Sequence, residues 1–232
     1  MGHLAEQGRH VAYPGTVIKA VVFDVGETLI DETRIWSRWA DRLGVPRLTL
    51  LGVLGGMAAL DRSYADAFAL VRPGLDLEEE SRRWAAEDPL GLRENFDADD
   101  LYPDVRPALA ALRGLGLGVV VAGNQPVQAK AALEAMALPV DAIYTSAQWG
   151  VEKPDPAFYA HVAQVAGVAA RHILYVGDRL DNDVLAAARS GLRTALLRRG
   201  PWGFLHAQRP QARSADLIVD DLFEVVEGVA TL

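Results

Sequence analysis

The stretch VVFDVGETLI, residues 21–30, starts as an apolar run and becomes polar at Asp24. The run reaches back to residue 17, and its unbroken hydrophobicity is typical of a parallel strand covered on both faces. Similar runs recur along the chain and alternate with helical patterns, so we predict an α/β fold on a doubly wound parallel sheet. The expected strands span residues 17–24, 117–124, 142–146, 172–178, 193–197 and 216–219.

Helical patterns fill most intervals between these strands, which predicts a three-layer, Rossmann-like sandwich. The expected helices span residues 105–113, 126–136, 156–166, 183–190 and 221–227. One interval differs, because residues 32–98 hold no convincing strand but carry helical patterns such as ETRIWSRWADRL. We therefore expect a tail at residues 1–16, an α/β core domain from residues 17–31 and 99–232, and an inserted all-helical domain at residues 32–98.

The composition of the 232 residues is that of an ordinary globular protein, with 50% hydrophobic residues and a net charge of −8. The acidic balance argues against nucleic acid or an anionic membrane as a partner. The absence of cysteine excludes disulfides, thiolate metal sites and a cysteine nucleophile. Neither a signal peptide nor a membrane span is evident. We expect a cytoplasmic protein, and the sequence leaves open whether it is a monomer or a homodimer.

Polar side chains gather where the predicted strands end. In an open parallel sheet, ligands bind beyond the carboxyl ends of the strands, so these residues are expected to lie at one edge. Taken singly, each of them is more often a helix cap or a turn residue than a catalytic group. The residues concerned are Asp24 after the first strand, Gly123 and Asn124 after the second, Lys153 after the third, and Asp178, Asp181 and Asp183 after the fourth.

This set of residues suits a magnesium site. Carboxylates crowded together repel one another unless a cation lies among them. Aspartate oxygens combined with a backbone carbonyl favour Mg²⁺ over zinc. Lys153 could neutralise the remaining charge and hold an anionic ligand, and an aspartate beside Mg²⁺ can attack a phosphoryl group.

Four segments carry a family resemblance, namely FDVGETL, VVAGN, EKPDPAFY and YVGDRLDNDV. In this order they resemble the haloacid dehalogenase-like (HAD) hydrolase superfamily over about residues 17–226, and the helical insertion resembles its cap. The resemblance implies that Asp24 forms an aspartyl-phosphate with a small phosphorylated substrate. It also implies that Asp24, the backbone carbonyl of Gly26 and Asp178 hold Mg²⁺, with Asp183 close by. Gly123, Asn124 and Lys153 would contact the phosphoryl group, and Lys153 would stabilise its charge.

Two positions depart from the pattern usual in the family's phosphatases. Gly26 stands where a second aspartate normally protonates the leaving oxygen and activates water, a role worth roughly 10²–10⁴-fold in rate. Gly123 replaces a serine or threonine hydroxyl. Another acid could substitute for the missing aspartate, and Glu27 is the first candidate. The favoured interpretation of Glu27 is nevertheless a solvated loop residue, because adjacent side chains tend to point apart. Asp31 or a cap residue are weaker candidates.

Three functions therefore remain open at the level of sequence. The first is a Mg²⁺-dependent phosphatase, in which a substitute acid or a good leaving group compensates for Gly26. The second is a haloacid dehalogenase, a class that lacks the second aspartate but also lacks the GDxxxND motif found here. The third is a non-catalytic relative that binds a phosphorylated ligand or a protein, against which the retention of Asp24, Lys153, Asp178 and Asp183 argues.

Overall fold

The centre of the molecule is a six-stranded sheet, in a computed structural model that describes residues 17–88 and 96–232. Every strand pair is parallel, and the order is β3-β2-β1-β4-β5-β6. This confirms the predicted fold class, and each predicted strand contains an observed one. The strands are β1 Ala20–Phe23, β2 Gly118–Gly123, β3 Ala142–Thr145, β4 Ile173–Gly177, β5 Arg193–Leu197 and β6 Leu217–Val219.

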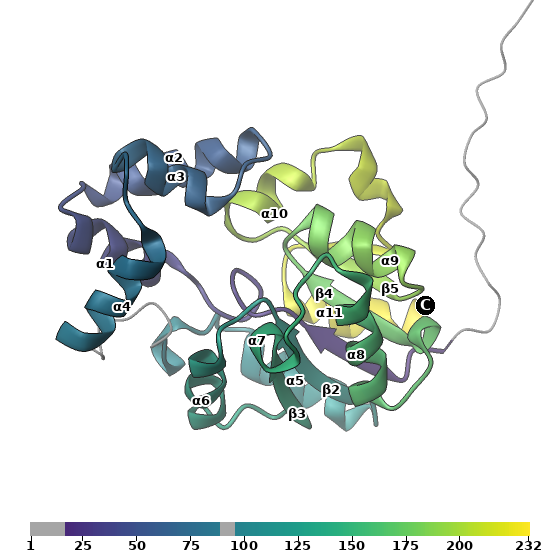
Figure 1. Cartoon of the computed structure of the whole chain (residues 1–232). Coiled ribbons are helices and arrows are strands. Elements are labelled where there is room, and N and C mark those ends of the chain that lie inside the picture. Colours follow the sequence, from purple (N-terminus) through teal and green to yellow (C-terminus); the bar gives the residue numbers. More distant parts are fainter. Residues whose placement is uncertain (1–16, 89–95) are drawn as a thin grey trace, which may run out of the picture.

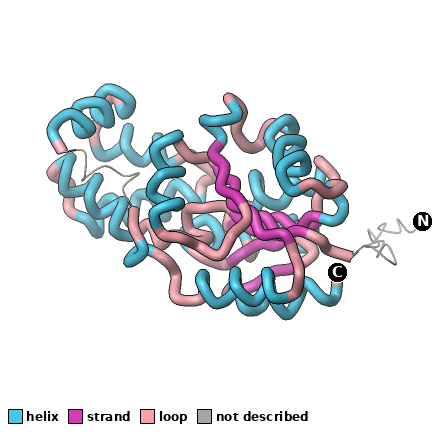
Figure 2. Tube along the Cα trace, turned by 90° about the horizontal axis from the view of Figure 1, so that it is seen from below, coloured by secondary structure: helices cyan, strands magenta, loops and turns pink. Residues whose placement is uncertain are grey.

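Helices cover both faces of the sheet, as Figures 1 and 2 show. All four residues of β1 are buried, and alternate ones contact opposite layers. Val21 and Phe23 share a core with the helices α5 (Val105–Gly114) and α11 (Leu222–Gly228), whereas Ala20 and Val22 share one with α8 (Pro156–Ala166). This two-sided burial explains the continuous apolar runs. The covering helices are α5 Val105–Gly114, α6 Val127–Ala135, α7 Ser146–Trp149, α8 Pro156–Ala166, α9 Ala187–Arg189, α10 Gly200–His206 and α11 Leu222–Gly228.

The helix expected at residues 183–190 differs from the prediction. A π-helical segment, η4 Leu180–Ala186, precedes α9, so the helical conformation begins three residues earlier. The carboxylate of Asp183 accepts a hydrogen bond from the Arg179 N–H at 2.8 Å, and Tyr159 donates to the carbonyl of Asn182 at 2.5 Å. These contacts satisfy polar groups in the first turn of the π-helical segment. Turns of this wide, π-helical type are frequent at functional sites. Short 3₁₀ turns complete the fold at η2 Ala98–Asp100, η3 Ala170–His172, η5 Pro210–Ser214 and η6 Val229–Thr231.

Between β1 and η2 the described residues form helices rather than strands. These are α1 Thr33–Leu43, α2 Arg47–Ala59, α3 Tyr64–Val71 and α4 Leu77–Glu87, which lie together at one side of the molecule in Figure 1. Aromatic side chains hold them together, since the Trp39 ring lies edge-on to Phe68 and to Trp84, with centroids 5.0 Å apart in both pairs. The predicted tail at residues 1–16 lies outside the described residues.

The topology leaves a crevice at the carboxyl ends of β1 and β4. The chain leaves β1 towards β2 and β3 on one side and later returns to β4, which pairs with the other edge of β1. Such a reversal of strand order separates the loops above it and is where ligands bind in open α/β sheets. Across the described part of the chain, no helix has the length and apolar character needed to cross a membrane.

Candidate active site

Asp24 and Lys153 meet in the crevice. Asp24 follows β1 directly, and its N–H donates to the Val176 carbonyl of β4 at 2.9 Å, which extends the sheet by one bond. Its Oδ1 lies 2.8 Å from the Lys153 ammonium, whose side chain is only 3% exposed. The same ammonium lies 2.6 Å from Asp183 Oδ1. Charge-assisted contacts at such distances hold the Asp24 carboxylate in one orientation.

Three buried aspartates lie close together at this site, and the single positive charge of the Lys153 ammonium does not balance their negative charge. Asp24, Asp178 and Asp183 each present an oxygen within 4.8 Å of the others. Burial, followed by the charges of neighbouring carboxylates, raises the pKa of Asp178 well above its usual range and the pKa of Asp183 to about 6. Burial alone would lower the pKa of Lys153, but Asp183 and Asp24 raise it well above its usual value. The surplus of buried negative charge fits a divalent cation with oxygen ligands.

Two glycines let these carboxylates lie against the sheet. A Cβ on Gly177, the last residue of β4, would overlap the Asp183 carboxylate. A Cβ on Gly123, the last residue of β2, would overlap Asp24 Oδ1. The departure at position 123 thus has a steric reason, because a serine or threonine there would displace Asp24 from its observed position.

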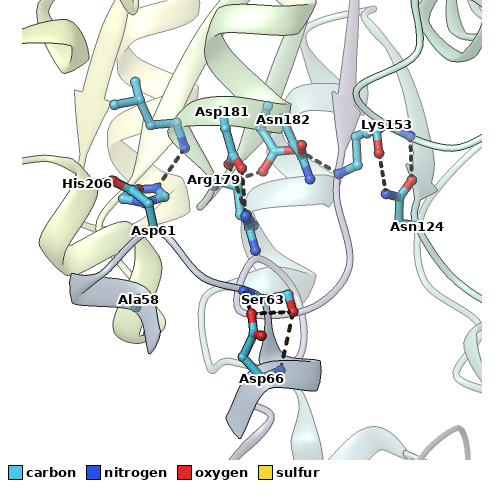
Figure 3. A network of polar contacts seen from close by, with 12 residues as sticks. Ala58, Asp61, Ser63, Asp66, Asn124, Lys153, Arg179, Asp181, Asn182 and His206 are labelled. Carbon is cyan, nitrogen blue, oxygen red and sulfur yellow. Dashed lines mark hydrogen bonds and ion pairs between the residues drawn. The ribbon is translucent and has the colours of Figure 1, made fainter. Parts of the chain in front are cut away.

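Asn124 binds the backbone of Lys153. Its Nδ2 donates to the Lys153 carbonyl at 2.9 Å, and its Oδ1 accepts from the Lys153 N–H at 2.8 Å, a reciprocal pair visible in Figure 3. This pair fixes the backbone from which the Lys153 ammonium reaches Asp24. The predicted contact of Asn124 with a phosphoryl group stays a prediction, although Asn124 lines the cavity above Asp24.

Glu27 is buried, so the interpretation of this residue as a solvated loop position is wrong. It is 8% exposed and has a positive φ of 49°. Its Oε2 accepts from the Tyr102 hydroxyl at 2.6 Å, and its Oε1 accepts from the Glu32 N–H at 3.1 Å. Burial and then the charge of Glu32 raise the pKa of Glu27 to about 7. The side chain packs over Gly200, where a Cβ would overlap it.

Residues of the helices between β1 and η2 and residues at the carboxyl ends of the strands line the site together. A cavity of about 150 Å³ lies above Asp24, Gly26, Lys153 and Asp178. A larger cavity of about 600 Å³ adjoins it. The two share a set of lining residues, namely Glu32, Tyr64, Asn124 and Gln125.

Several residues around these cavities were not predicted from the sequence. Arg179 lines the smaller cavity, with its guanidinium 5.2 Å from the Trp202 ring centroid and paired with Asp181. Tyr64 and Glu32 reach it from the helical insertion. For Glu32 a signal existed: it occupies the N-cap of α1, where serine, threonine, aspartate or asparagine is usual.

With this geometry in hand, comparison with known proteins gives the family. The model of the haloacid dehalogenase-like hydrolases matches residues 18–191. The chain is a member of this hydrolase family. The hydrolase is 30% identical over 239 residues to phosphoglycolate phosphatase of Pseudomonas putida, an alignment that spans 94% of this chain and 82% of the relative. It is 28% identical over 237 residues to glyceraldehyde 3-phosphate phosphatase of Methanopyrus kandleri, spanning 92% and 99%.

Solved structures show the same fold for this HAD-like hydrolase. A HAD-superfamily hydrolase of subfamily IA from Geobacter sulfurreducens superposes with a TM-score of 0.66 at 22% identity, covering 94% of this chain and 100% of the other. L-2-haloacid dehalogenase of Xanthobacter autotrophicus superposes with a TM-score of 0.65 at 21% identity, covering 93% and 100%. This fold is thus shared with a protein named as a dehalogenase, so the fold alone does not decide the chemistry.

Proposed function

We propose that this HAD-like hydrolase is a phosphatase, which transfers the phosphoryl group of a small phosphorylated molecule first to Asp24 and then to water. The observation that carries the proposal is the contact of the Lys153 ammonium with both Asp24 and Asp183 at the carboxyl ends of β1 and β4. The relatives named as phosphatases over nearly the whole chain support it.

Each residue of the cluster has a part in this reaction. An oxygen of Asp24 attacks phosphorus, and the bond to the leaving oxygen breaks. Lys153 holds the Asp24 carboxylate and lies where negative charge gathers on the transferring group. Asp183 binds the Lys153 ammonium from the opposite side and is itself held by the Arg179 N–H. Because Lys153 is buried, its charge acts in a medium of low dielectric constant.

We propose that Asp24, the backbone carbonyl of Gly26 and Asp178 hold Mg²⁺, with Asp183 beside them. The surplus of carboxylate charge over the Lys153 ammonium supports this assignment. When bound, Mg²⁺ supplies positive charge against the phosphoryl oxygens. Glycine at position 26 is compatible with it, since the ligand there is a main-chain carbonyl.

We propose residues 32–98 as a cap domain over a core of residues 17–31 and 99–232. Trp36 and Tyr64 of the insertion line the same cavity as Asp24 and Lys153. The cap has a second contact with the core, because Asp61 pairs with Arg209. Asp61 also lies 3.7 Å from the His206 ring, and both residues are labelled in Figure 3. A cap in this position excludes water from the attacking Asp24.

Release of inorganic phosphate tests the proposal. The substrates are 4-nitrophenyl phosphate, phosphoglycolate and glyceraldehyde 3-phosphate, each with and without Mg²⁺, and the proteins are the wild type, Asp24→Asn and the exposed-site control Asp99→Asn. We expect Mg²⁺-dependent release by the wild type and the control and none by Asp24→Asn. Release by Asp24→Asn equal to that of the wild type would refute the role of Asp24, and absence of release by the wild type on every ester would refute a phosphatase.

A further inference from the structure

The space beside Gly26 is filled by the carboxylate of Glu32. A Cβ built on Gly26 would lie 2.6 Å from Glu32 Oε1, 2.9 Å from its Cδ and 3.5 Å from its Oε2. In an aspartate, ordinary bond lengths place the carboxylate oxygens about 2.4 Å from Cβ. The Glu32 carboxylate therefore lies about as far from that Cβ as the carboxylate of an aspartate at position 26 would lie. A side chain at position 26 would have to displace it.

The local fold directs Glu32 to this place. Glu32 is the N-cap residue of α1, yet its side chain makes no capping hydrogen bond. Instead Oε2 accepts from the Trp36 indole N–H at 3.1 Å, one helical turn further on. The Glu32 N–H donates to Glu27, which Tyr102 holds in turn. Glu32 is 9% exposed, so the fold buries in the crevice an acidic side chain that does not cap the first N–H groups of its own helix.

The position of Glu32 between the two cavities suits proton transfer. Glu32 lines the cavity above Asp24 and also the larger adjoining one, which has room for the rest of a substrate. If the phosphoryl group lies at Asp24 and the leaving group lies in the larger cavity, the oxygen that links them lies between the two cavities, both of which Glu32 lines. A general acid must reach that oxygen.

On the basis of the proposed phosphatase function, we propose that Glu32 is the general acid and base of this hydrolase, in place of the carboxylate absent at Gly26. In the first step Asp24 forms a bond to phosphorus, the bond from phosphorus to the leaving oxygen breaks, and Glu32 gives its proton to that oxygen. In the second step a water oxygen attacks phosphorus, Glu32 takes a proton from the water, and the bond between phosphorus and Asp24 breaks. The alcohol and phosphate leave, and Glu32 is again protonated.

Neighbouring carboxylates are less suited to this role. Both oxygens of Glu27 accept hydrogen bonds, Oε2 from the Tyr102 hydroxyl and Oε1 from the Glu32 N–H at the start of α1, which makes Glu27 a positioning residue for Glu32. Asp31 Oδ1 accepts from the Thr33 N–H at 2.9 Å, and Asp31 lines cavities other than the one above Asp24.

The test compares two substrates with different leaving groups in the variant Glu32→Gln. Glutamine is chosen because it keeps an acceptor for the Trp36 indole N–H. With phenyl phosphate, which needs an acid, we expect kcat/KM to fall by about 10²–10⁴-fold. With 2,4-dinitrophenyl phosphate, whose leaving group needs no proton, we expect a fall of less than about tenfold in kcat/KM, and a burst of dinitrophenol followed by slow turnover, because the base of the second step is missing. Asp31→Asn, the adjacent control, should keep the wild-type ratio between the two esters.

A second variant protects the test against a merely structural effect. Gly26→Asp combined with Glu32→Ala removes the carboxylate that a side chain at position 26 would meet. We expect this double variant to be at least about tenfold more active on phenyl phosphate than Glu32→Ala alone. Equal losses on both esters in Glu32→Gln, or no loss on either, would overturn the role of Glu32. A wild type that releases phosphate from neither ester would instead overturn the proposed phosphatase.

Discussion

Replacing Lys153 with methionine tests the charge balance of the site. The ammonium lies 2.8 Å from Asp24 and 2.6 Å from Asp183, and each contact at such a distance corresponds to about 6 kcal/mol at an effective dielectric constant of about 20. Much of this attraction offsets the cost of burying the ions, so the net loss on removing one partner is about 3–5 kcal/mol of unfolding free energy. Methionine keeps the length and apolar stem of the side chain and removes its charge.

The loss of unfolding free energy in Lys153→Met should depend on pH. Asp183 has a pKa of about 6 even beside Lys153, and in Lys153→Met that pKa rises further. Between the usual aspartate pKa and these raised values the folded variant binds more protons than the unfolded chain, so its unfolding free energy falls as pH rises. The loss relative to the wild type is therefore small at about pH 5 and grows towards about pH 8.

Urea unfolding without divalent cations measures both effects. Lys130→Met is the matched control, because its ammonium lies 3.7 Å from Glu134 on the surface of α6 and is worth less than about 1 kcal/mol. A loss in Lys153→Met that equals the control, or that does not change with pH, would refute the charge balance derived for the site.

Further predictions concern packing and the attachment of the cap. Gly203→Ala should lower the free energy of unfolding by about 1–3 kcal/mol, because its Cβ would overlap a backbone carbonyl at the end of β5. Gly52→Ala on α2, where a Cβ meets nothing within 4 Å, should raise it by about 0.5–1 kcal/mol, and thermal or urea unfolding compares the two. Asp61→Asn should weaken the closed position of the cap by removing the pair with Arg209, and raise KM by about two- to fivefold with little change in kcat. Unchanged KM in Asp61→Asn would exclude a role for this contact in cap closure.

The sheet could be predicted from the sequence because each strand is buried on both faces. The apolar run at residues 193–197 agrees with β5 in every residue. Each of the other strands is shorter than the apolar run that predicted it, by one or more residues at one or both ends. At Asp24 and Asp178 the strand ends where the chain places a carboxylate in the crevice. The π-helical segment at Leu180 could not be foreseen, because it depends on contacts from Arg179 and Tyr159 rather than on periodicity.

The meeting of Asp24, Lys153, Asp178 and Asp183 followed from the rule that parallel strands end at one edge. The surroundings of Glu27 could not be predicted from the sequence, because its burial depends on Tyr102, 75 positions further along the chain.

Glu32 is an unusual N-cap residue, but its place beside Gly26 could not be predicted from the sequence. That place is defined by the absence of a side chain at Gly26, and a sequence does not show what fills the space that a glycine leaves.

The most direct measurement is mass spectrometry of the peptide that contains Asp24, after rapid acid quenching of the wild-type enzyme with Mg²⁺ and 2,4-dinitrophenyl phosphate. We expect one phosphoryl group on Asp24 during turnover of the wild type, and none on Asp24→Asn. Turnover with no phosphoryl group on Asp24, or with one on another residue, would contradict a phosphatase that works through Asp24.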